Sequence, residues 1–427
     1  MTNYGQGTLC VQGGYKPGNG EARAVPIIQS TTFAYDTCEA LGELFDLKAA
    51  GYFYSRLQNP TNDNVAAKIC ELEGGSAAML TSSGQAASFF SIFNIAENGD
   101  HIVASNTIYG GTYNLFNVTM RRMGIDFTFV DPNCSIEELN SAFKPNTKAV
   151  FGETIANPVL TVLDIEKFAN AAHSHGVPLI VDNTFATPVN CKPFDFGADI
   201  VVHSTTKYMD GHGSGVGGAI VDHGIFDWTA QADKFSCFNE PDESYHGVIY
   251  TESFGNAGAY ITKCTTQLMR DLGAIQAPQN AFLVNIGLES LHVRMSKHCE
   301  NALAVANLLE SSDKIESVTY PGLKSDPNYE LAQKYMKNGT CGVLSFRTKG
   351  GKESALEFMK NLKLGTIETH VADARTCCLH PASTTHRQLS VAELEAAGIY
   401  PNTIRLSCGI EDTEDLISDI QNALSFV

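Results

Sequence analysis

Three polar residues of different chemistry recur at equal spacing in the middle of the chain. Asn157, Asp182 and Lys207 are separated by two intervals of 25 residues, and each comes shortly after an apolar run. An interval of that length holds one strand, one crossover helix and their connections. An amide, a carboxylate and an amine are therefore expected together at one edge of a parallel sheet.

The amine and the carboxylate suit one kind of cofactor chemistry. A lysine enclosed by apolar surroundings loses hydration, so its pKa falls and its amine becomes able to form Schiff bases. Asp182 has no obvious salt-bridge partner within 179–184, so its burial requires a cation. The protonated ring nitrogen of pyridoxal phosphate (PLP) is such a cation, with aspartate as its recurrent partner. Residues 81–87 follow a strand and open a helix, which offers N–H groups to a phosphate, and Ser204 and Thr206 add hydroxyls.

A sheet is needed to bring these residues together, and the chain has the apolar runs to build one. Such runs occur at 77–80, 101–104, 126–130, 149–152, 177–181 and 199–202. Between two of them, Asp164 is a candidate N-cap for a helix that Gly176 ends. Strands that are apolar on both faces and separated by helices predict a mostly parallel α/β sheet covered by helices. Ligands of such sheets bind beyond the carboxyl ends of the strands.

The texture of the sequence divides the chain into three parts. Residues 1–60 carry prolines and many glycines with weak periodicity, so we expect an N-terminal arm that contacts a neighbouring subunit. Residues 61–262 contain the βα rhythm and form the predicted PLP-binding α/β domain. Residues 263–427 have longer helical stretches, including a last helix with Leu416, Ile417, Ile420 and Leu424 on one face, and predict a smaller α+β domain.

Composition limits the classes of function. The chain has 427 residues, with 29 Lys and Arg against 47 Asp and Glu, and its net charge of −18 argues against nucleic acid as the main partner. Charged residues make up 18%, below the roughly 25% of soluble domains, which suggests surface hidden in an oligomer. No signal peptide or membrane-spanning stretch is evident, so we expect a cytoplasmic protein without membrane contact. The 12 cysteines are scattered without a C-x-x-C pair, which favours reduced core residues over disulfides or zinc.

Each candidate residue also has an ordinary structural interpretation. An isolated lysine such as Lys207 is far more often a solvated surface residue, and an isolated Asp182 is as often an N-cap or turn residue. Only their joint placement at consecutive strand ends favours catalysis. The glycine run 211–218 suggests a dinucleotide-dependent oxidoreductase, but no apolar strand directly precedes it and no helix-forming run follows it, so a tight loop is the better interpretation.

The histidines near these segments carry weaker signals. His173 and His175 point apart on a helix, so they are poor co-ligands for a metal. His203, His212 and His386 are candidates to contact the site, although structural histidines are more common. We therefore predict no metal site.

At these residues the sequence resembles the Cys/Met-metabolism family of fold-type I PLP-dependent enzymes over nearly the whole chain. The most specific stretches are 54–56 with 59–61, 83–87, 109–112, 153–154 with 157–158, 182–184, 204–208, 380–386, and 405–407 with 409–412. Within the family, Gln85 and the segments 240–247 and 383–390 resemble the O-acetylhomoserine sulfhydrylase branch. Methionine γ-lyases tend to carry cysteine where this chain has Gly111, which points away from the lyases.

The resemblance implies a role for each matching residue. Lys207 would hold PLP covalently and move substrate protons, Asp182 would keep the ring nitrogen protonated, and Tyr109 would stack on the ring and assist catalysis. The other implied cofactor contacts are Gly84, Gln85, Ser204 and Thr206 at the phosphate, Asn157 at the ring hydroxyl, Glu153 and Thr184, and Tyr54 and Arg56 from a neighbouring subunit. The implied substrate contacts are Arg405, at the α-carboxylate, with Tyr54, His370 and Val371.

The implied reaction is a γ-replacement in methionine and cysteine biosynthesis. O-acetyl-L-homoserine would exchange acetate for sulfide, or for a thiol such as methanethiol, giving L-homocysteine or L-methionine. Alternatives within the family are methionine γ-lyase and cystathionine γ-synthase or γ-lyase. A non-catalytic sulfur-supplying partner protein is a further alternative, which the intact Lys207, Asp182 and Arg405 disfavour.

Two features of the resemblance concern the substrate and the assembly. The branch usually has asparagine at the position of His370 and glycine at that of Ala372, so the acyl preference and the nucleophile are less firmly implied than the cofactor. The family also implies a homo-oligomer, a tetramer built from dimers that share their active sites.

Overall fold

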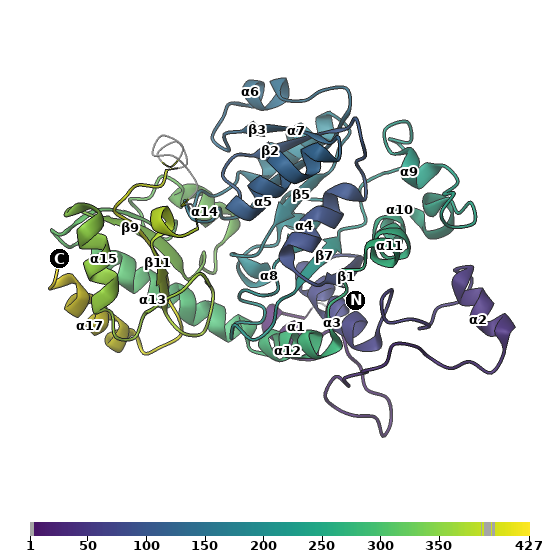
Figure 1. Ribbon diagram of the computed structural model, residues 1–427, viewed down its shortest axis with the longest axis horizontal. Helices are drawn as coiled ribbons and strands as arrows, with labels where there is room; N and C mark the ends of the chain where they lie inside the picture. Colours follow the sequence, from purple (N-terminus) through teal and green to yellow (C-terminus); the bar gives the residue numbers. More distant parts are fainter. Residues whose placement is uncertain (1–3, 386, 388–393, 395–397) are drawn as a thin grey trace.

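The computed structural model describes residues 4–385, 387, 394 and 398–427, which form two sheets with their covering helices (Figure 1). The larger sheet has seven strands in the order β1-β7-β6-β5-β4-β2-β3. They are β1 (Ala77–Thr81), β2 (His101–Ser105), β3 (Asp126–Val130), β4 (Thr147–Glu153), β5 (Leu179–Asp182), β6 (Ile200–His203) and β7 (Gly218–Asp222). Strands β2 to β6 pair in parallel, which confirms the predicted mostly parallel α/β sheet.

Helices cover this sheet, and β2, β6 and β7 are buried along their whole length, so both faces are shielded from water. The helices of this part are α3 (Pro60–Glu73), α4 (Gly84–Phe93), α5 (Gly110–Asn114) with the π-helix Leu115–Met120, α6 (Ile136–Ser141), α7 (Ile165–Ser174), α8 (Thr187–Asn190), the 3-10 helix Pro193–Phe196, α9 (Ser236–Asn239), α10 (Tyr250–Lys263) with the π-helix Cys264–Met269, α11 (Arg270–Leu272) and α12 (Pro278–Glu289). Asp164 caps α7 by accepting the N–H of Lys167, as predicted. In the described ranges, no helix combines the length and the apolar character that crossing a membrane requires.

Strand β7 is the element of the large sheet that the sequence did not predict. It begins inside the glycine-rich run and pairs antiparallel with both β1 and β6. Gly218 is needed there because a Cβ at this position would lie 2.3 Å from the carbonyl oxygen of Ser83. The glycines therefore let a strand pass close to the start of α4, and they do not form a strand–loop–helix phosphate site for a dinucleotide.

The smaller sheet has five strands in the order β10-β11-β12-β9-β8. They are β8 (Ile315–Thr319), β9 (Val343–Thr348), β10 (Thr366–Ile367), β11 (Cys377–Leu379) and β12 (Thr403–Ser407). The accompanying helices are α13 (Leu291–Glu310), α14 (Tyr329–Tyr335), α15 (Gly351–Asn361), the 3-10 helix Pro381–Ser383 and α17 (Thr413–Leu424). Leu416, Ile420 and Leu424 are buried on one face of α17, which confirms the predicted last helix.

Helix α13 joins the two hydrophobic cores. Leu291 and Met295, near its start, belong to the core of the large sheet, whereas Ala302 and Leu309 belong to the core of the small sheet. We propose three structural parts, residues 1–60, 61–262 and 263–427, with helices α10 to α13 as the passage from the second to the third. In Figure 1 the small sheet and α17 lie at one end of the molecule, and the large sheet lies at its centre.

The N-terminal segment has two helices but no core of its own. Helix α1 (Gln6–Gln12) contacts α3, α12 and α13, and α2 (Cys38–Phe45) projects away from the body (Figure 1). Between them the chain is mostly exposed, and it returns through an antiparallel bridge between Thr32 and Tyr54.

Candidate functional site

The carboxyl ends of β4, β5 and β6 place the predicted residues next to one another. Glu153 and Asp182 are register partners in the β4–β5 pair, and Asp182 is in turn the partner of Val202 in β6. Lys207 follows the end of β6 by four residues, in the turn that leads toward β7. The equal intervals seen in the sequence therefore correspond to neighbouring parallel strands, as expected.

Asp182 is held by the residue two positions after it. Its Oδ1 accepts a hydrogen bond from the backbone N–H of Thr184 at 2.9 Å and a short one from the Thr184 hydroxyl. The Thr184 hydroxyl oxygen in turn accepts the N–H of Ser204 at 2.8 Å, which ties the ends of β5 and β6 together. Burial raises the pKa of Asp182 above its usual range, and the two bonds from Thr184 oppose that effect. A cation in contact with this carboxylate would offset the cost of its burial.

Glu153 is a second buried carboxylate beside Asp182. One of its oxygens accepts the backbone N–H of Tyr109 at 2.7 Å, which fixes the start of α5. Burial, followed by repulsion from Asp182, raises the pKa of Glu153 well above its usual value. The Tyr109 ring is 46% exposed and lies over Gly111, where an added Cβ would come 2.5 Å from a ring carbon. A glycine at that position therefore gives the ring its room.

The N-terminus of α4 forms the neighbouring wall. Ser83 caps the helix by accepting the N–H of Ala86 at 3.1 Å, which leaves the N–H groups of Gly84 and Gln85 without partners within the helix. A Cβ on Gly84 would lie 2.6 Å from the Cβ of Ser204, so glycine lets the helix start lie directly against the end of β6. The Gln85 side chain accepts a hydrogen bond from the Thr112 hydroxyl at 3.0 Å. The helix dipole and the free N–H groups make this wall suitable for a phosphate.

Thr206 lies beside this wall, but its hydroxyl is engaged in a loop contact. It donates to the carbonyl of Gly217 at 3.2 Å and accepts the N–H of Gly217 at 3.1 Å. A phosphate contact from Thr206, which stays a prediction, requires the hydroxyl to turn away from the Gly217 carbonyl.

Lys207 has the electrostatic surroundings expected of a reactive amine. Burial, together with repulsion from the Arg405 guanidinium, lowers the pKa of Lys207 to about 8. Its Nζ lies 3.4 Å from Nδ1 of His370, and no carboxylate in the described part of the chain forms an ion pair with it. A substantial fraction of the amine is therefore neutral near physiological pH, as a nucleophile or proton acceptor requires.

Arg405 brings β12 of the small sheet to the same place. Its guanidinium donates to Asn157 Oδ1 at 3.3 Å and to the carbonyl oxygens of Thr369 and His370 at 3.3 and 3.2 Å. Arg405 is only 5% exposed, and burial lowers its pKa to about 10. None of the described carboxylates forms an ion pair with it, so a charge is buried with neutral partners only. Such a group is suited to bind the carboxylate of a ligand.

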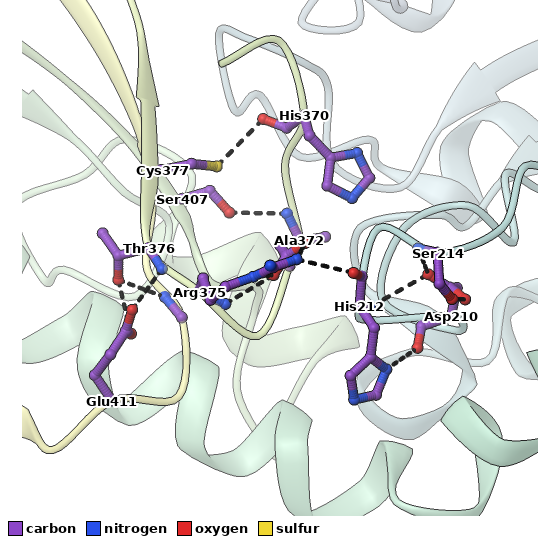
Figure 2. A network of polar contacts seen from close by, with 12 residues as sticks. Asp210, His212, Ser214, His370, Ala372, Arg375, Thr376, Cys377, Ser407 and Glu411 are labelled. Carbon is purple, nitrogen blue, oxygen red and sulfur yellow. Dashed lines mark hydrogen bonds and ion pairs between the residues drawn. The ribbon is translucent and has the colours of Figure 1, made fainter. Parts of the chain in front are cut away.

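Figure 2 shows the loop 370–376, which follows β10 and lies beside the loop 210–214. Its backbone is held by β12 and β11: the N–H of Ala372 donates to the Ser407 hydroxyl at 2.8 Å, and the Cys377 thiol donates to the carbonyl of His370 at 3.3 Å. Ala372 adopts a φ of 66°, the left-handed conformation that favours glycine. Val371 is 1% exposed and belongs to the large core, so any substrate contact from it comes through its backbone.

Tyr54 and Arg56 are not brought to this site within one chain. Both are exposed on the N-terminal arm, with the Arg56 guanidinium 5.2 Å from the centre of the Tyr54 ring. In the described residues, neither side chain forms a hydrogen bond or ion pair with the residues at the carboxyl ends of β4, β5 and β6. Of the other candidates, His212 lies in the loop 210–214, and His386 lies outside the described residues.

Sequence reasoning missed a buried network behind the strand ends. Glu73, the last residue of α3, accepts hydrogen bonds from His203 at 2.6 Å and from the Asn183 side chain at 2.9 Å. All three residues are buried, and attraction from His203 opposes the rise that burial causes in the pKa of Asp182. Glu73 gave no signal in the sequence, because a carboxylate at a helix end is ordinarily solvated.

Comparison with known proteins identifies the family. The model of the family described as Cys/Met metabolism PLP-dependent enzymes matches residues 7–425. The chain belongs to this family. It is 46% identical to the homocysteine synthase of Schizosaccharomyces pombe, over 98% of this chain and 97% of that protein. It is 42% identical to the O-acetyl-L-homoserine sulfhydrylase of Leptospira meyeri, over 99% of this chain and 97% of that protein.

A solved structure agrees with the fold over the whole length. It is that of a Campylobacter jejuni protein assigned as an O-acetylhomoserine (thiol)-lyase, which contains a pyridoxyl-lysine-phosphate residue. The two share 38% sequence identity with a TM-score of 0.94, covering 99% of this chain and 100% of that one. The chain is therefore a PLP-dependent enzyme of this family.

The residues present in this structure fit PLP. Asp182 is a desolvated carboxylate in need of a cationic partner, and Lys207 is an amine with a pKa lowered to about 8. Gly84 provides the close approach that a phosphate at the start of α4 requires. Among the described residues no group of histidine, cysteine and acidic side chains is arranged to hold a metal ion.

Proposed function

We propose that the protein replaces the acetyl ester group of O-acetyl-L-homoserine by sulfide, or by a thiol such as methanethiol, to give L-homocysteine or L-methionine and acetate. The observation that carries the proposal is the convergence of Lys207, Asp182 and Arg405 at one sheet edge, in a chain 46% identical to a homocysteine synthase. The match over nearly the full length of relatives with that activity supports the substrate class.

Bound PLP would supply an electron sink that stabilises negative charge developing on the substrate carbons. We propose that Asp182 pairs with its ring nitrogen, and that Lys207 holds it covalently in the resting enzyme. Gly84, Gln85 and Ser204 would bind the phosphate through N–H and hydroxyl donors, and Thr206 would join them. The remaining proposed contacts are Asn157, Glu153, Thr184 and the ring of Tyr109.

The substrate would be oriented by its α-carboxylate on Arg405. A planar guanidinium can bind both carboxylate oxygens, and this one is prepared for an anion because its present partners are all neutral oxygens. That grip places the substrate Cα and Cβ within the region of Lys207 and His370, since the carbonyl of His370 is itself bonded to Arg405.

Lys207 would then move protons. Its neutral amine accepts a proton from Cα, and the resulting ammonium returns protons to the carbon chain as acetate leaves and the thiol adds. An amine with a pKa of about 8 can serve both directions, because neither protonation state is strongly favoured near neutral pH.

The assembly belongs to the same proposal. Tyr54 and Arg56 would complete the phosphate site of a neighbouring subunit, so the smallest active unit would be a dimer and the full assembly a tetramer built from two such dimers. Support comes from the arm, which exposes large apolar side chains, among them Ile27, Tyr35 and Phe45, without a core of its own.

A product assay with and without sulfide tests the reaction. Purified protein is incubated with O-acetyl-L-homoserine, with and without sulfide, and homocysteine is expected only when sulfide is present. Lys207→Ala should abolish turnover and the visible absorbance of bound PLP, whereas the exposed Lys337→Ala should change neither. Release of 2-oxobutanoate from methionine as the main reaction would show that the protein is a γ-lyase instead.

A further inference from the structure

His370 contacts the reactive amine with one ring nitrogen and leaves the other free. Its Nδ1 lies 3.4 Å from Lys207 Nζ. An ammonium can only donate, so Nδ1 accepts, and the proton of the neutral imidazole lies on Nε2. Nε2 is buried and has no hydrogen-bond partner in the described part of the chain. The imidazole is thus a donor–acceptor unit with one end on Lys207.

The free nitrogen, Nε2, faces the contact between the loops 210–214 and 370–376, which we call the seam. A Cβ built on Gly213 would lie 2.8 Å from Asp373 Oδ2 and 3.7 Å from His370 Nε2, so the loop 210–214 passes at contact distance from both side chains. Figure 2 shows the two loops side by side, with Arg375 donating to the carbonyl of His212 at 2.9 Å. His212, Gly213 and Ser214 are exposed, so this seam leads from the buried Nε2 of His370 to solvent.

The reaction has a proton to dispose of, an argument that rests on the proposed function. Replacement of the acetyl ester by a neutral thiol yields a thioether or thiol product, an acetate ion and one proton. Lys207 is the group proposed to carry protons in the site, and its amine is desolvated although the residue is only partly buried. A turnover therefore ends with a proton that has to leave a desolvated amine.

We propose that His370 is a proton-transfer partner of Lys207 that passes this proton to solvent along the 210–214 seam. The N–H bond of the Lys207 ammonium breaks as an N–H bond forms at Nδ1. The Nε2–H bond then breaks, and a water molecule at the seam accepts the proton, which leaves a neutral imidazole with its proton on Nδ1. Exchange with water, in which Nε2 gains a proton and Nδ1 loses one, resets the tautomer before the next turnover. His370 acts through Lys207 and is a positioning residue.

The charges around the imidazole suit this task. Burial, followed by repulsion from Lys207, lowers the pKa of His370 below its usual value. The carboxylates of Asp373, Glu368 and Asp210 act in the opposite direction, and Arg405 bonds to the backbone carbonyl of His370 and not to its ring. The resting imidazole is therefore neutral and able to accept a proton at neutral pH.

Three variants separate proton transfer from a purely structural role. His370→Asn keeps a hydrogen-bond acceptor but cannot relay a proton, and His370→Ala has neither property. His212→Asn is the matched control, because His212 lies at the same seam and, among the described residues, its side chain bonds only to the carbonyl of Asp210. Steady-state kinetics with O-acetyl-L-homoserine and methanethiol are measured across pH, with and without added imidazole. The pH dependence of PLP uptake by the apoprotein is followed by visible absorbance.

We expect kcat to fall about tenfold in both His370 variants while KM for O-acetyl-L-homoserine stays within about twofold, since proton transfer by a positioned side chain contributes at least that much. Imidazole should restore part of the rate of His370→Ala. The midpoint of PLP uptake should fall by about one pH unit in His370→Ala, because the Lys207 ammonium loses an acceptor, and should stay near the wild-type value in His370→Asn.

Two results would overturn the inference while leaving the proposed function intact. The first is that the wild-type enzyme makes homocysteine and the His370→Asn variant has the same kcat and pH profile as the wild type. The other is a defect in His370→Ala that imidazole does not relieve and that His212→Asn shares. Absence of homocysteine with the wild-type enzyme would instead contradict the proposed function.

Discussion

Two cations, the partly buried Lys207 and the buried Arg405, lie at the site without a carboxylate partner among the described residues. Burial lowers the pKa of both groups, and repulsion from Arg405 lowers that of Lys207 further. A protein stabilised only for folding would pair or remove such charges, because an unpaired buried charge is costly. Their cost is explained if the cofactor and the substrate carboxylate are the missing partners.

Ala372 has a strained backbone conformation in the loop that carries His370. Its φ of 66° costs an L-residue about 1–2 kcal/mol relative to right-handed conformations. Ala372→Gly should therefore raise the free energy of unfolding by about 1 kcal/mol, after allowance for the greater freedom of glycine in the unfolded chain. Thermal unfolding of the PLP-loaded enzyme measures the change.

Ala374 provides the control for this loop, because its φ is not positive. Ala374→Gly should lower stability by about 0.5–1 kcal/mol, since glycine there gains only unfolded-state freedom. Equal effects of the two substitutions would show that the left-handed backbone at Ala372 carries no strain.

At the scale of elements, the fit between α4 and β6 determines the phosphate wall. Alanine is normally the better helix former, yet a Cβ on Gly84 would lie 2.6 Å from the Cβ of Ser204. Gly84→Ala should therefore push the helix start away from β6 and weaken PLP binding about tenfold, because overpacking costs about 1–3 kcal/mol. Titration of apoprotein with PLP, followed by visible absorbance, measures the affinity.

Gly42, in the projecting helix α2, is the matched control. A Cβ there meets nothing within 4 Å, so Gly42→Ala should leave PLP affinity unchanged. If Gly84→Ala bound PLP as tightly as the wild-type protein, close contact between α4 and β6 would not be what shapes the phosphate wall.

The sequence was sufficient for the parallel strands because their apolar runs and the recurring interval reflect a local rule, one strand and one crossover helix per unit. It predicted Lys207 and Asp182 at adjacent strand ends for the same reason. Strand β7 was missed because a glycine such as Gly218 is typical of loops. Only the structure shows why glycine is needed in this strand: a Cβ at Gly218 would lie 2.3 Å from the carbonyl oxygen of Ser83. Glu73 was missed because only tertiary packing buries it against His203.

At the scale of the whole molecule, the low content of charged residues agrees with the exposed apolar surface of the arm, which has no core within its own chain. Charged residues make up 18% of the chain, and the arm exposes Ile27, Tyr35 and Phe45. Tyr54 and Arg56 lie on the same arm, away from the site of their own subunit. We therefore expect each arm to be covered by, and to serve, a second copy of the chain.

Mixing two impaired variants tests this arrangement. Arg56→Ala should weaken PLP retention and activity, and Lys207→Ala should abolish activity. If the site combines Lys207 of one subunit with Arg56 of its neighbour, a mixed dimer contains one site with both wild-type residues.

After subunit exchange, an equimolar mixture should recover about a quarter of wild-type activity, because half of the dimers are mixed and each has one intact site. Co-expression with two different affinity tags, followed by purification on both, enriches the mixed dimers and should raise the recovered activity to about half. A mixed dimer no more active than Arg56→Ala alone would place Arg56 outside the neighbour's site, because sites confined to one chain cannot complement one another.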